Sequence, residues 1–212
     1  MRYEDGSKQL VNCFVNRKLV GTRVYDEDGY LCLESPLKDG QLHGIKYTWY
    51  FDGILTSAEP FLNGKAHGVS KQWSPSGELI GKYTMTQGTG VDLWWHSVNG
   101  SGEAPFYLSE VHCMQDGLPH GYAWWINEDQ KTVEVERHFD EGIRHGIFRE
   151  WNHHGRLGRG FPQYFIKGTK VRKHQYIHFS TKDKSLPVFH DQDNLPNRIF
   201  PVEIRQHLLK QN

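Results

Sequence analysis

The sequence has few of the features that mark membrane, secreted or disulfide-stabilised proteins. Its 212 residues include three cysteines, Cys13, Cys32 and Cys113, which are widely spaced and form no CxxC pair. This pattern disfavours both a disulfide framework and a zinc ribbon. No apolar run approaches the roughly 20 residues of a membrane-spanning helix, and the acidic N-terminus lacks the apolar core of a secretory leader. We therefore expect a cytoplasmic protein without a membrane span.

An excess of charge of one sign is also lacking. Lys and Arg together number 25, as do Asp and Glu, and the pI is near 7.2. A neutral chain has no long-range field that would attract nucleic acid, so we expect no nucleic-acid partner. The most basic stretch, "KGTKVRKH" at 167–174, is interpreted as a solvated strand rather than a phosphate site.

Catalytic motifs are lacking as well. The sequence contains no GxSxG, HExxH, Walker or GxGxxG pattern, and its acids are spread without a paired-carboxylate cluster. Cys113 follows His112 in an expected strand, where adjacent side chains point to opposite faces and cannot form a local nucleophile–base pair. We therefore expect neither enzymatic activity nor a cofactor.

The most distinctive feature of the sequence is a repeated hexapeptide. The stretches "DGQLHG", "NGKAHG", "DGLPHG" and "EGIRHG" begin at Asp39, Asn63, Asp116 and Glu141. Less complete copies contain Gly21 and Gly90, and a later one begins near 166. With these included, the repeat glycines recur roughly every 22–31 residues, which is typical of a repeat array.

Each repeat is predicted to form a β-hairpin. The first, third and fifth residues after the repeat glycine are mostly apolar, and the second and fourth are mostly polar, which indicates a strand with one buried face. A Gly-containing turn and a returning strand follow, as in "TVEVERHF", where Val133, Val135 and Phe139 alternate with Glu134, Glu136 and His138. The next Asp-Gly, Asn-Gly or Glu-Gly turn starts another unit.

The predicted fold is therefore all-β, an elongated antiparallel β-meander of stacked β-hairpin repeats. The array should occupy residues 1–179 as about seven units, of which the outer ones and the fourth are degenerate. Residues 180–212 form a Pro-containing tail, in which a short helix is expected to begin at Pro201 with Val202, Ile204 and Leu208 along one side. We expect the tail to cap the last hairpin; a partner-binding peptide is the alternative.

The pattern [DN]-G-x-x-H-G-x4-W-x3-G-x-L resembles the MORN repeat, in the variant form abundant in bacterial proteins. The stretches "DGQLHGIKYTWYFDGIL", "NGKAHGVSKQWSPSGEL" and "EGIRHGIFREWNHHGRL" carry the resemblance, which covers about residues 16–178. It implies a twisted sheet built from hairpins. Many bacterial members of that family resemble antitoxin or immunity proteins, and others are scaffolds, but the resemblance implies no catalytic residue set.

The repeat histidines His43, His67, His120 and His145 admit two interpretations. They are either metal ligands or a general base, or they hold neighbouring repeats together by packing and by bonding a turn carbonyl. Equivalent strands of a two-stranded repeat lie roughly 10 Å apart, which is too far for neighbouring histidines to share one zinc ion. We favour the structural interpretation and expect no metal site. The pair His153 and His154 is interpreted as an exposed turn, with weak metal binding as the alternative.

The tryptophans indicate two faces. Trp49, Trp73, Trp95 and Trp151 share one repeat position, and Trp124 lies two residues earlier in its strand, so they should form a ladder on the buried face. Trp94, Trp125 and Phe148 have the opposite parity and are expected to form an apolar patch on a polar face, a common mark of binding sites. The alternative is that the insertion before Phe106 or the tail covers them.

The sequence thus favours a non-catalytic protein-binding repeat module, and specifically a toxin-neutralising antitoxin or immunity protein whose partner is encoded by an adjacent gene. A general MORN-type scaffold is the second interpretation, and a metal-dependent enzyme using the repeat histidines is the third. Self-association through sheet edges is a further expectation.

Overall fold

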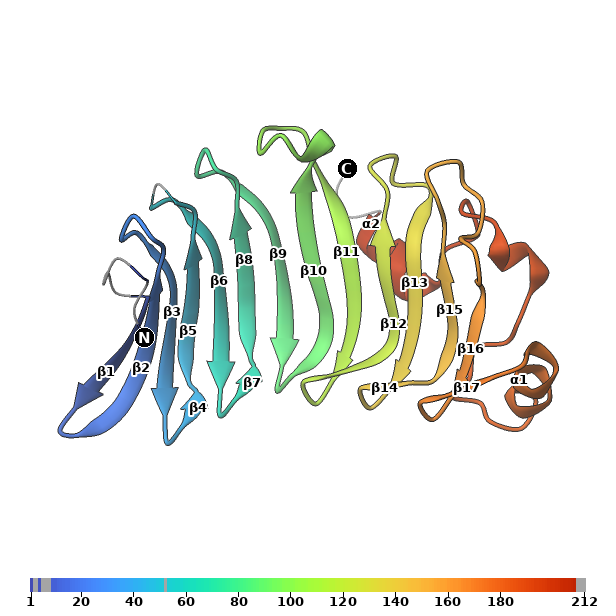
Figure 1. The fold of residues 1–212 in the computed structure, drawn as a ribbon, viewed down its shortest axis with the longest axis horizontal. Coiled ribbons are helices and arrows are strands. Elements are labelled where there is room, and N and C mark those ends of the chain that lie inside the picture. Colours follow the sequence, from blue (N-terminus) through green and yellow to red (C-terminus); the bar gives the residue numbers. More distant parts are fainter. Residues whose placement is uncertain (2–3, 5–8, 52, 209–212) are drawn as a thin grey trace. The chain divides into compact units, whose positions relative to one another are not determined.

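The computed structural model describes residues 1, 4, 9–51 and 53–208. By internal contacts the chain divides into two units. Unit 1 consists of Met1–Gly90 with Ser97–Phe106, and unit 2 of Val91–His96 with Tyr107–Asn212. Both units are built from antiparallel strands in chain order, and the all-β meander expected from the sequence is confirmed in each (Figure 1). No helix in the described part of the chain is long and apolar enough to cross a membrane.

Unit 1 is a meander of hairpins whose long strands each pair with the next. The strands are β1 (Leu10–Val15), β2 (Lys18–Tyr25), β3 (Leu31–Lys38), β4 (Gln41–Leu42), β5 (Gly44–Trp49), β6 (Leu55–Leu62), β7 (Lys65–Ala66), β8 (Gly68–Trp73) and β9 (Leu79–Thr86). Strand β10 (Thr89–Ser97) begins in unit 1, where Thr89 and Gly90 pair with β9, and a 3-10 turn, η1 (Val98–Gly100), follows it.

Unit 2 continues the hairpins and adds the chain's helices. It contains Val91–His96 of β10, and its further elements are β11 (Phe106–Gln115), β12 (Leu118–Ile126), β13 (Val133–Asp140), β14 (Ile143–Arg144), β15 (Gly146–Glu150), β16 (Gln163–Ile166), β17 (Thr169–Val171), α1 (Lys173–Ser180), the 3-10 turn η2 (Asp191–Asn194) and α2 (Val202–Leu208). Strands β12, β13, β15, β16 and β17 pair in that order.

Tight turns connect successive hairpin repeats. At Asn63-Gly64, for example, φ is 50° and then 80°, the positive pair of a type I′ turn, whose twist matches that of antiparallel strands. The repeat glycine has another role at Gly146 (φ +143°), where an added Cβ would lie 2.6 Å from the His138 side chain. Glycine is therefore needed at that position for close approach as well as for conformation.

The expected burial pattern is wrong in part of unit 1. Ile45 and Val69, assigned to the buried face, are 41% and 46% exposed, whereas Ser70 and Gln72, assigned to the polar face, are 2% and 7% exposed. Among the described residues, unit 1 has no α-helix and no second sheet to cover the apolar side chains. Small side chains such as Ser70 become buried between longer neighbours, and the branched side chains stay in solvent.

In unit 2 the tail covers one face of the sheet, which we call the ladder face because Trp124 and Trp151 lie on it. The Phe200 ring meets the Trp124 ring edge-on at 4.8 Å, and the indole N–H of Trp151 donates to the Asn194 carbonyl at 2.8 Å. Leu186 packs with Ile147, Tyr164 and Tyr176 in one buried cluster. Burial of the ladder face thus depends on residues that follow the repeats.

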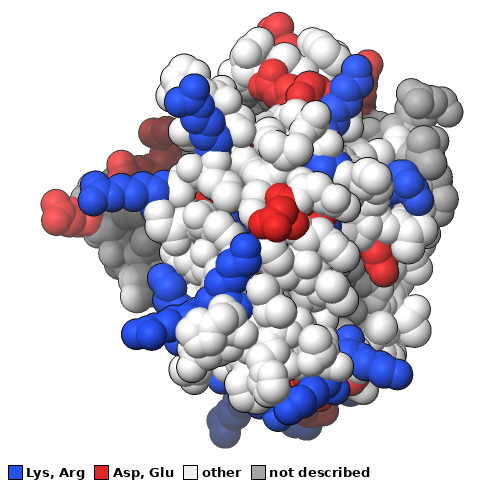
Figure 2. All heavy atoms as spheres, turned by 90° about the vertical axis from the view of Figure 1, so that its right-hand side faces the viewer, with Lys and Arg blue, Asp and Glu red and all other residues white. Residues whose placement is uncertain are grey.

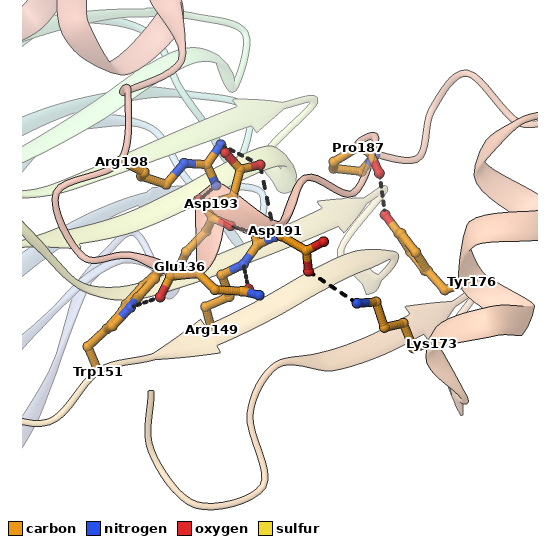
Figure 3. Close-up of polar contacts among 10 residues, drawn as sticks. Glu136, Arg149, Trp151, Lys173, Tyr176, Pro187, Asp191, Asp193 and Arg198 are labelled. Carbon is orange, nitrogen blue, oxygen red and sulfur yellow. Dashed lines mark hydrogen bonds and ion pairs between the residues drawn. The ribbon is translucent and has the colours of Figure 1, made fainter. Parts of the chain in front are cut away.

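The end of the meander differs from the expectation. Strands were expected to continue to about residue 179, but they end at β17, and α1 begins at Lys173. The segment 167–174, interpreted as a solvated strand, contains a turn, a short strand and the start of this helix. Tyr176 explains the helix, because its fully buried ring packs on Tyr164 while its hydroxyl donates to the Pro187 carbonyl at 2.7 Å (Figure 3).

Candidate protein-binding surface

Trp125 lies on the face of unit 2 opposite Trp124. Strand β12 places the two indoles on opposite sides, and Trp124 is fully buried while Trp125 is half-buried. The Trp125 ring lies between two cationic or titratable neighbours. The His112 ring centroid is 4.8 Å away, and the Arg137 guanidinium carbon lies 4.9 Å from the Trp125 centroid. An arginine at this distance from an indole is held by cation–π attraction.

Phe148 belongs to a second aromatic group on the same face. Its ring centroid lies 5.5 Å from that of Phe139 and 4.8 Å from that of Phe165, and the Arg144 guanidinium carbon lies 5.7 Å from it. Phe148 is 7% exposed, so the expectation that its ring faces a partner is corrected. Phe148 supports the surface from below, and the exposed Arg144 lies above it.

We call the set Trp125, Phe139, Phe148, Phe165, Arg137 and Arg144 the aromatic–arginine surface. Among the described residues, the tail contacts of Trp124 and Trp151 lie on the ladder face, so the tail is not what shields Trp125. Arg137 and Arg144 are both exposed. Tryptophan and arginine are the side chains most enriched at binding hot spots.

Trp94 is half-buried in β10, and its carbonyl accepts a hydrogen bond of 3.0 Å from the Ser109 hydroxyl. Its neighbours Leu93 and Trp95 are 6% and 7% exposed. The alternation of burial along this strand agrees with the parity that separates Trp94 from the ladder position of Trp95. The other expected ladder residues, Trp49 and Trp73 in unit 1, are half-buried.

The repeat histidines connect each hairpin repeat to the next one along the chain. In three of them Nδ1 accepts a hydrogen bond from the first residue of the following type I′ turn: from Gln87 N–H to His67 (3.2 Å), from Glu141 N–H to His120 (3.4 Å) and from Lys167 N–H to His145 (3.0 Å). His43 Nδ1 lies 3.2 Å from the Asn63 side-chain oxygen. The expected partner was a turn carbonyl; the observed partner in three cases is a backbone N–H.

A second bond accompanies the first. The N–H of the turn glycine donates to the carbonyl of the residue before the histidine, as from Gly88 to Ala66 at 2.7 Å and from Gly142 to Pro119 at 2.8 Å. In the turns that follow His67, His120 and His145, two backbone donors are thereby satisfied by the preceding hairpin repeat. This matters because unpaired backbone donors cost stability. The recurrence at successive turns explains why the histidine repeats with the hairpin.

His145 resembles part of a catalytic triad but has the wrong tautomer for one. Its Nε2 lies 3.0 Å from the Ser185 hydroxyl and 3.4 Å from an Asp183 carboxylate oxygen. Because Nδ1 accepts from the Lys167 N–H, the neutral ring carries its proton on Nε2. That nitrogen therefore donates and cannot remove a proton from Ser185. The contact ties the start of the tail to β15 instead.

Replacing His67 with alanine is expected to lower the free energy of unfolding by about 1–2 kcal/mol, the common range for a point change. The Gln87 N–H would lose its acceptor, and unit 1 would lose one of its inter-repeat contacts. Urea unfolding followed by circular dichroism measures the effect. Exposed His153, replaced in the same way, serves as the control and should change stability by less than about 0.5 kcal/mol.

The structural interpretation also predicts no dependence on bound metal. Elemental analysis of protein dialysed against chelator-free buffer should give no stoichiometric zinc. Zinc at one ion per chain, lost in the His67→Ala or His120→Ala variant, would contradict it. Among the described residues, no group of three or more His, Cys, Asp or Glu side chains is placed to hold a metal ion.

A charged cluster in unit 2 lies under the tail (Figure 3). Glu136 on β13 is fully buried, and its two oxygens accept from the guanidinium groups of Arg149 on β15 and Arg198 in the tail. The Arg198 contact is 2.6 Å long, and Arg198 also lies 3.2 Å from Asp193. Arg149 donates to Asn194 at 3.1 Å. Burial of these groups suits a structural cluster rather than a solvent-accessible active site.

A cavity of about 730 Å³ in unit 2 is lined by aromatic, polar and acidic residues, including Tyr107, Trp151, Glu128, Asp129 and Glu134. Asp129 is already committed to its own hairpin, since it accepts from the N–H groups of Lys131 and Thr132 at 2.8 Å. Burial opposes ionisation, but these bonds hold the pKa of Asp129 below its usual value. Burial also raises the pKa of Tyr107. Neither Asp129 nor Tyr107 is therefore activated as a base or nucleophile.

Burial shifts the pKa values of three further titratable groups, Cys113, His112 and His138, toward their neutral forms. Burial raises the pKa of the Cys113 thiol, which makes it a poor nucleophile at neutral pH. Burial lowers the pKa of His138, whose Nδ1 donates to the His145 carbonyl at 2.6 Å, and it lowers the pKa of His112. In all three cases burial is the largest cause of the shift.

The lowered pKa values predict that stability falls in acid. Near pH 6, histidine of the unfolded chain (pKa about 6.5) binds protons that folded His138 and His112 do not, so stability increases with pH in this window. We expect the urea midpoint to fall from pH 7.5 to pH 5 and to level off below the folded pKa values. His138→Gln should reduce that slope while keeping a donor for the His145 carbonyl; an unchanged slope would contradict the assignment to His138.

Several residues of the site were missed by sequence reasoning. Arg137 and Arg144 lie over aromatic rings, but the sequence pattern alone assigned no role to either residue. The alternation in β13 and β15 contained the available signal, because a register pairing Ala123 with Arg137 puts Arg137 beside Trp125. The tail contacts of Arg198 and Phe200 had no comparable signal in the repeat pattern.

Comparison with known proteins adds no assignment. No protein-family model matches the chain, and no curated protein matches it.

The surface of unit 2 at its C-terminal end shows Lys, Arg, Asp and Glu side chains scattered among uncharged ones rather than gathered into a field of one sign (Figure 2).

Proposed function

We propose that this chain is a non-catalytic protein-binding module that neutralises a toxin protein encoded by an adjacent gene. The observation that carries the binding role is the aromatic–arginine surface, in which half-buried Trp125 lies under exposed Arg137 on strands fixed by the hairpin array. The neutralising role follows from the sequence resemblance to bacterial antitoxin-type repeat proteins.

Rigidity supports this proposal. Trp125 is presented by β12 between paired neighbours on β11 and β13, so binding requires little ordering of backbone. A low ordering cost leaves more of the contact energy for affinity, as tight inhibition of a toxin requires. A general scaffold would use the same surface without inhibiting its partner, and it is the second candidate.

Co-expression tests the proposal. The neighbouring open reading frame is induced alone, with the wild-type chain, and with a Trp94→Ala/Trp125→Ala variant. We expect arrested growth in the first culture, rescue in the second, and reduced rescue in the third at equal levels of folded protein. A harmless product, or a toxic one that the wild-type chain does not rescue, would exclude neutralisation. A stable complex without rescue would favour the scaffold.

A further inference from the structure

Two lysines face each other on the ladder face of unit 1, the side that carries Trp49 and Trp73. Lys71 on β8 pairs directly with Lys82 on β9, and both side chains are exposed. On the other side of Lys71 the register places Ala58. Within residues 9–51 and 53–208, no carboxylate is paired with either ammonium group. Like charges directly opposite across strands destabilise a sheet, so the fold itself does not explain this pair.

Apolar side chains lie beside the lysine pair. Val69 precedes Lys71 by two residues on the same face and is 46% exposed, and Ile45 on β5 is 41% exposed. On the other side, Leu79 is 51% exposed and pairs with half-buried Trp73. A cationic pair flanked by exposed apolar groups is complementary in charge and polarity to a segment that carries carboxylates between apolar side chains.

The tail shows what occupies the equivalent position in unit 2. Lys71 is the third residue after repeat glycine Gly68, and Arg149 is the third after Gly146. Arg149 is 2% exposed because the tail lies over it. The tail supplies Asn194 and Asp193 to the arginines of that cluster.

Apolar anchors on both sides hold that tail segment in place. Leu186, 3% exposed, lies before the acidic turn η2, and Phe200, 9% exposed, follows it. The ladder face thus accommodates an irregular chain segment that has carboxylates at its centre and apolar side chains at its ends. In unit 1 the same repeat position carries Lys71, which pairs with Lys82. Among the described residues of unit 1, no such chain segment covers this position.

We propose that the ladder face of unit 1 around Lys71 and Lys82 is a second interaction surface, which binds an acidic segment of a partner protein. The partner's carboxylates contact the two ammonium groups, and its apolar side chains pack on Val69, Ile45 and the Trp73–Leu79 pair. The carboxylates relieve the lysine repulsion, which makes the surface selective for acidic segments. This surface is separate from the aromatic–arginine surface, and it does not require that the partner be a toxin.

Selection from a random peptide library displayed on phage, with the full chain as target, tests this surface without a known partner. Enriched peptides are synthesised with a fluorophore and their affinities measured by anisotropy. We expect sequences with Asp or Glu flanked by Leu, Phe or Trp. Lys71→Glu/Lys82→Glu should weaken their binding by about tenfold or more, and higher salt should weaken it as well. The charge-matched variant Lys18→Glu/Lys131→Glu should bind as the wild type does.

A single substitution separates binding from folding. Lys82→Glu creates an opposite-charge pair with Lys71, so the thermal midpoint should rise while peptide affinity falls. Trp94→Ala/Trp125→Ala should leave peptide affinity unchanged, which keeps this result distinct from the fate of the proposed function. Peptides without acidic residues, or equal binding to the double-reversal variant, would overturn the proposal. So would lysine-dependent binding of single-stranded RNA or phosphatidylserine vesicles when no acidic peptide binds.

Discussion

Replacing Arg149 with alanine should destabilise the fold by about 3–5 kcal/mol, the usual consequence of removing one partner of a buried ion pair. Glu136 is fully buried, and the substitution would leave its carboxylate with Arg198 as its one remaining guanidinium in the cluster. The Asn194 side chain would lose its donor from Arg149 as well. Urea unfolding monitored by tryptophan fluorescence measures the loss, because Trp124 and Trp151 lie on the same face.

The control is Arg156→Ala, which removes an exposed arginine from the turn after β15; we expect a change within about 0.5 kcal/mol. A second variant tests the source of the loss. In Glu136→Gln/Arg149→Met, the central charges are removed together, so less destabilisation is expected than in Arg149→Ala. Equal losses in the two variants would mean that the loss comes from a contact that both variants remove, such as the guanidinium donor to Asn194, rather than from an uncompensated charge.

The Arg149→Ala variant also tests whether the charged cluster holds the tail against the sheet. Arg198 and Phe200 reach β13 and β12 from a segment that follows the last strand. If the charged cluster fixes this segment, Arg149→Ala should raise protease cleavage within residues 181–201 before the sheet unfolds. Resistance equal to that of the wild type would show that the apolar contacts of Leu186 and Phe200 suffice.

The hairpins were predictable because their signals are local. The Asn-Gly and Asp-Gly turns require positive φ at both residues, and the structure has 50° and 80° at both Asn63-Gly64 and Asp39-Gly40. Period-two alternation then gave the strands and separated Trp124 from Trp125. These features depend on backbone chemistry within a few residues, so one sequence suffices to find them.

Which face becomes buried was not predictable in the same way. Parity separates two faces of a strand, but a covering layer decides which one is buried, and that layer comes from distant residues. Glu136, grouped with polar alternation in the sequence, is fully buried because Arg149 and Arg198 neutralise it under the tail. Ile45 shows the converse, since it has the apolar parity but is 41% exposed.

The histidine contact was half predictable. Recurrence at one repeat position indicated a structural role, but it did not distinguish a turn carbonyl from a turn N–H as the partner. The structure places the Lys167 N–H 3.0 Å from His145 Nδ1, a geometry set by the positive-φ conformation of the turn. Whether a ring nitrogen donates or accepts depends on three-dimensional geometry, which sequence spacing does not contain.

Truncating Trp125 should cost about 2 kcal/mol or more of binding energy in the proposed complex, or roughly thirtyfold in affinity, with the fold intact. The indole is half-buried in the free chain, and its ring contacts His112 and Arg137 rather than the tail. A partner that covers it would desolvate both the indole and the guanidinium, which is where cation–π attraction is strongest. Titration calorimetry with the purified neighbouring gene product measures the loss.

Three variants make that result specific. Arg137→Ala should weaken binding less than Trp125→Ala does, because it removes the cation and leaves the apolar ring. Phe14→Ala, at an aromatic residue of unit 1 that is 60% exposed, should leave affinity unchanged. Trp124→Ala should unfold unit 2, since its fully buried ring packs on Phe200. If Trp125→Ala also unfolds the chain, then both tryptophans of β12 belong to the core, and the aromatic–arginine surface is not a binding site.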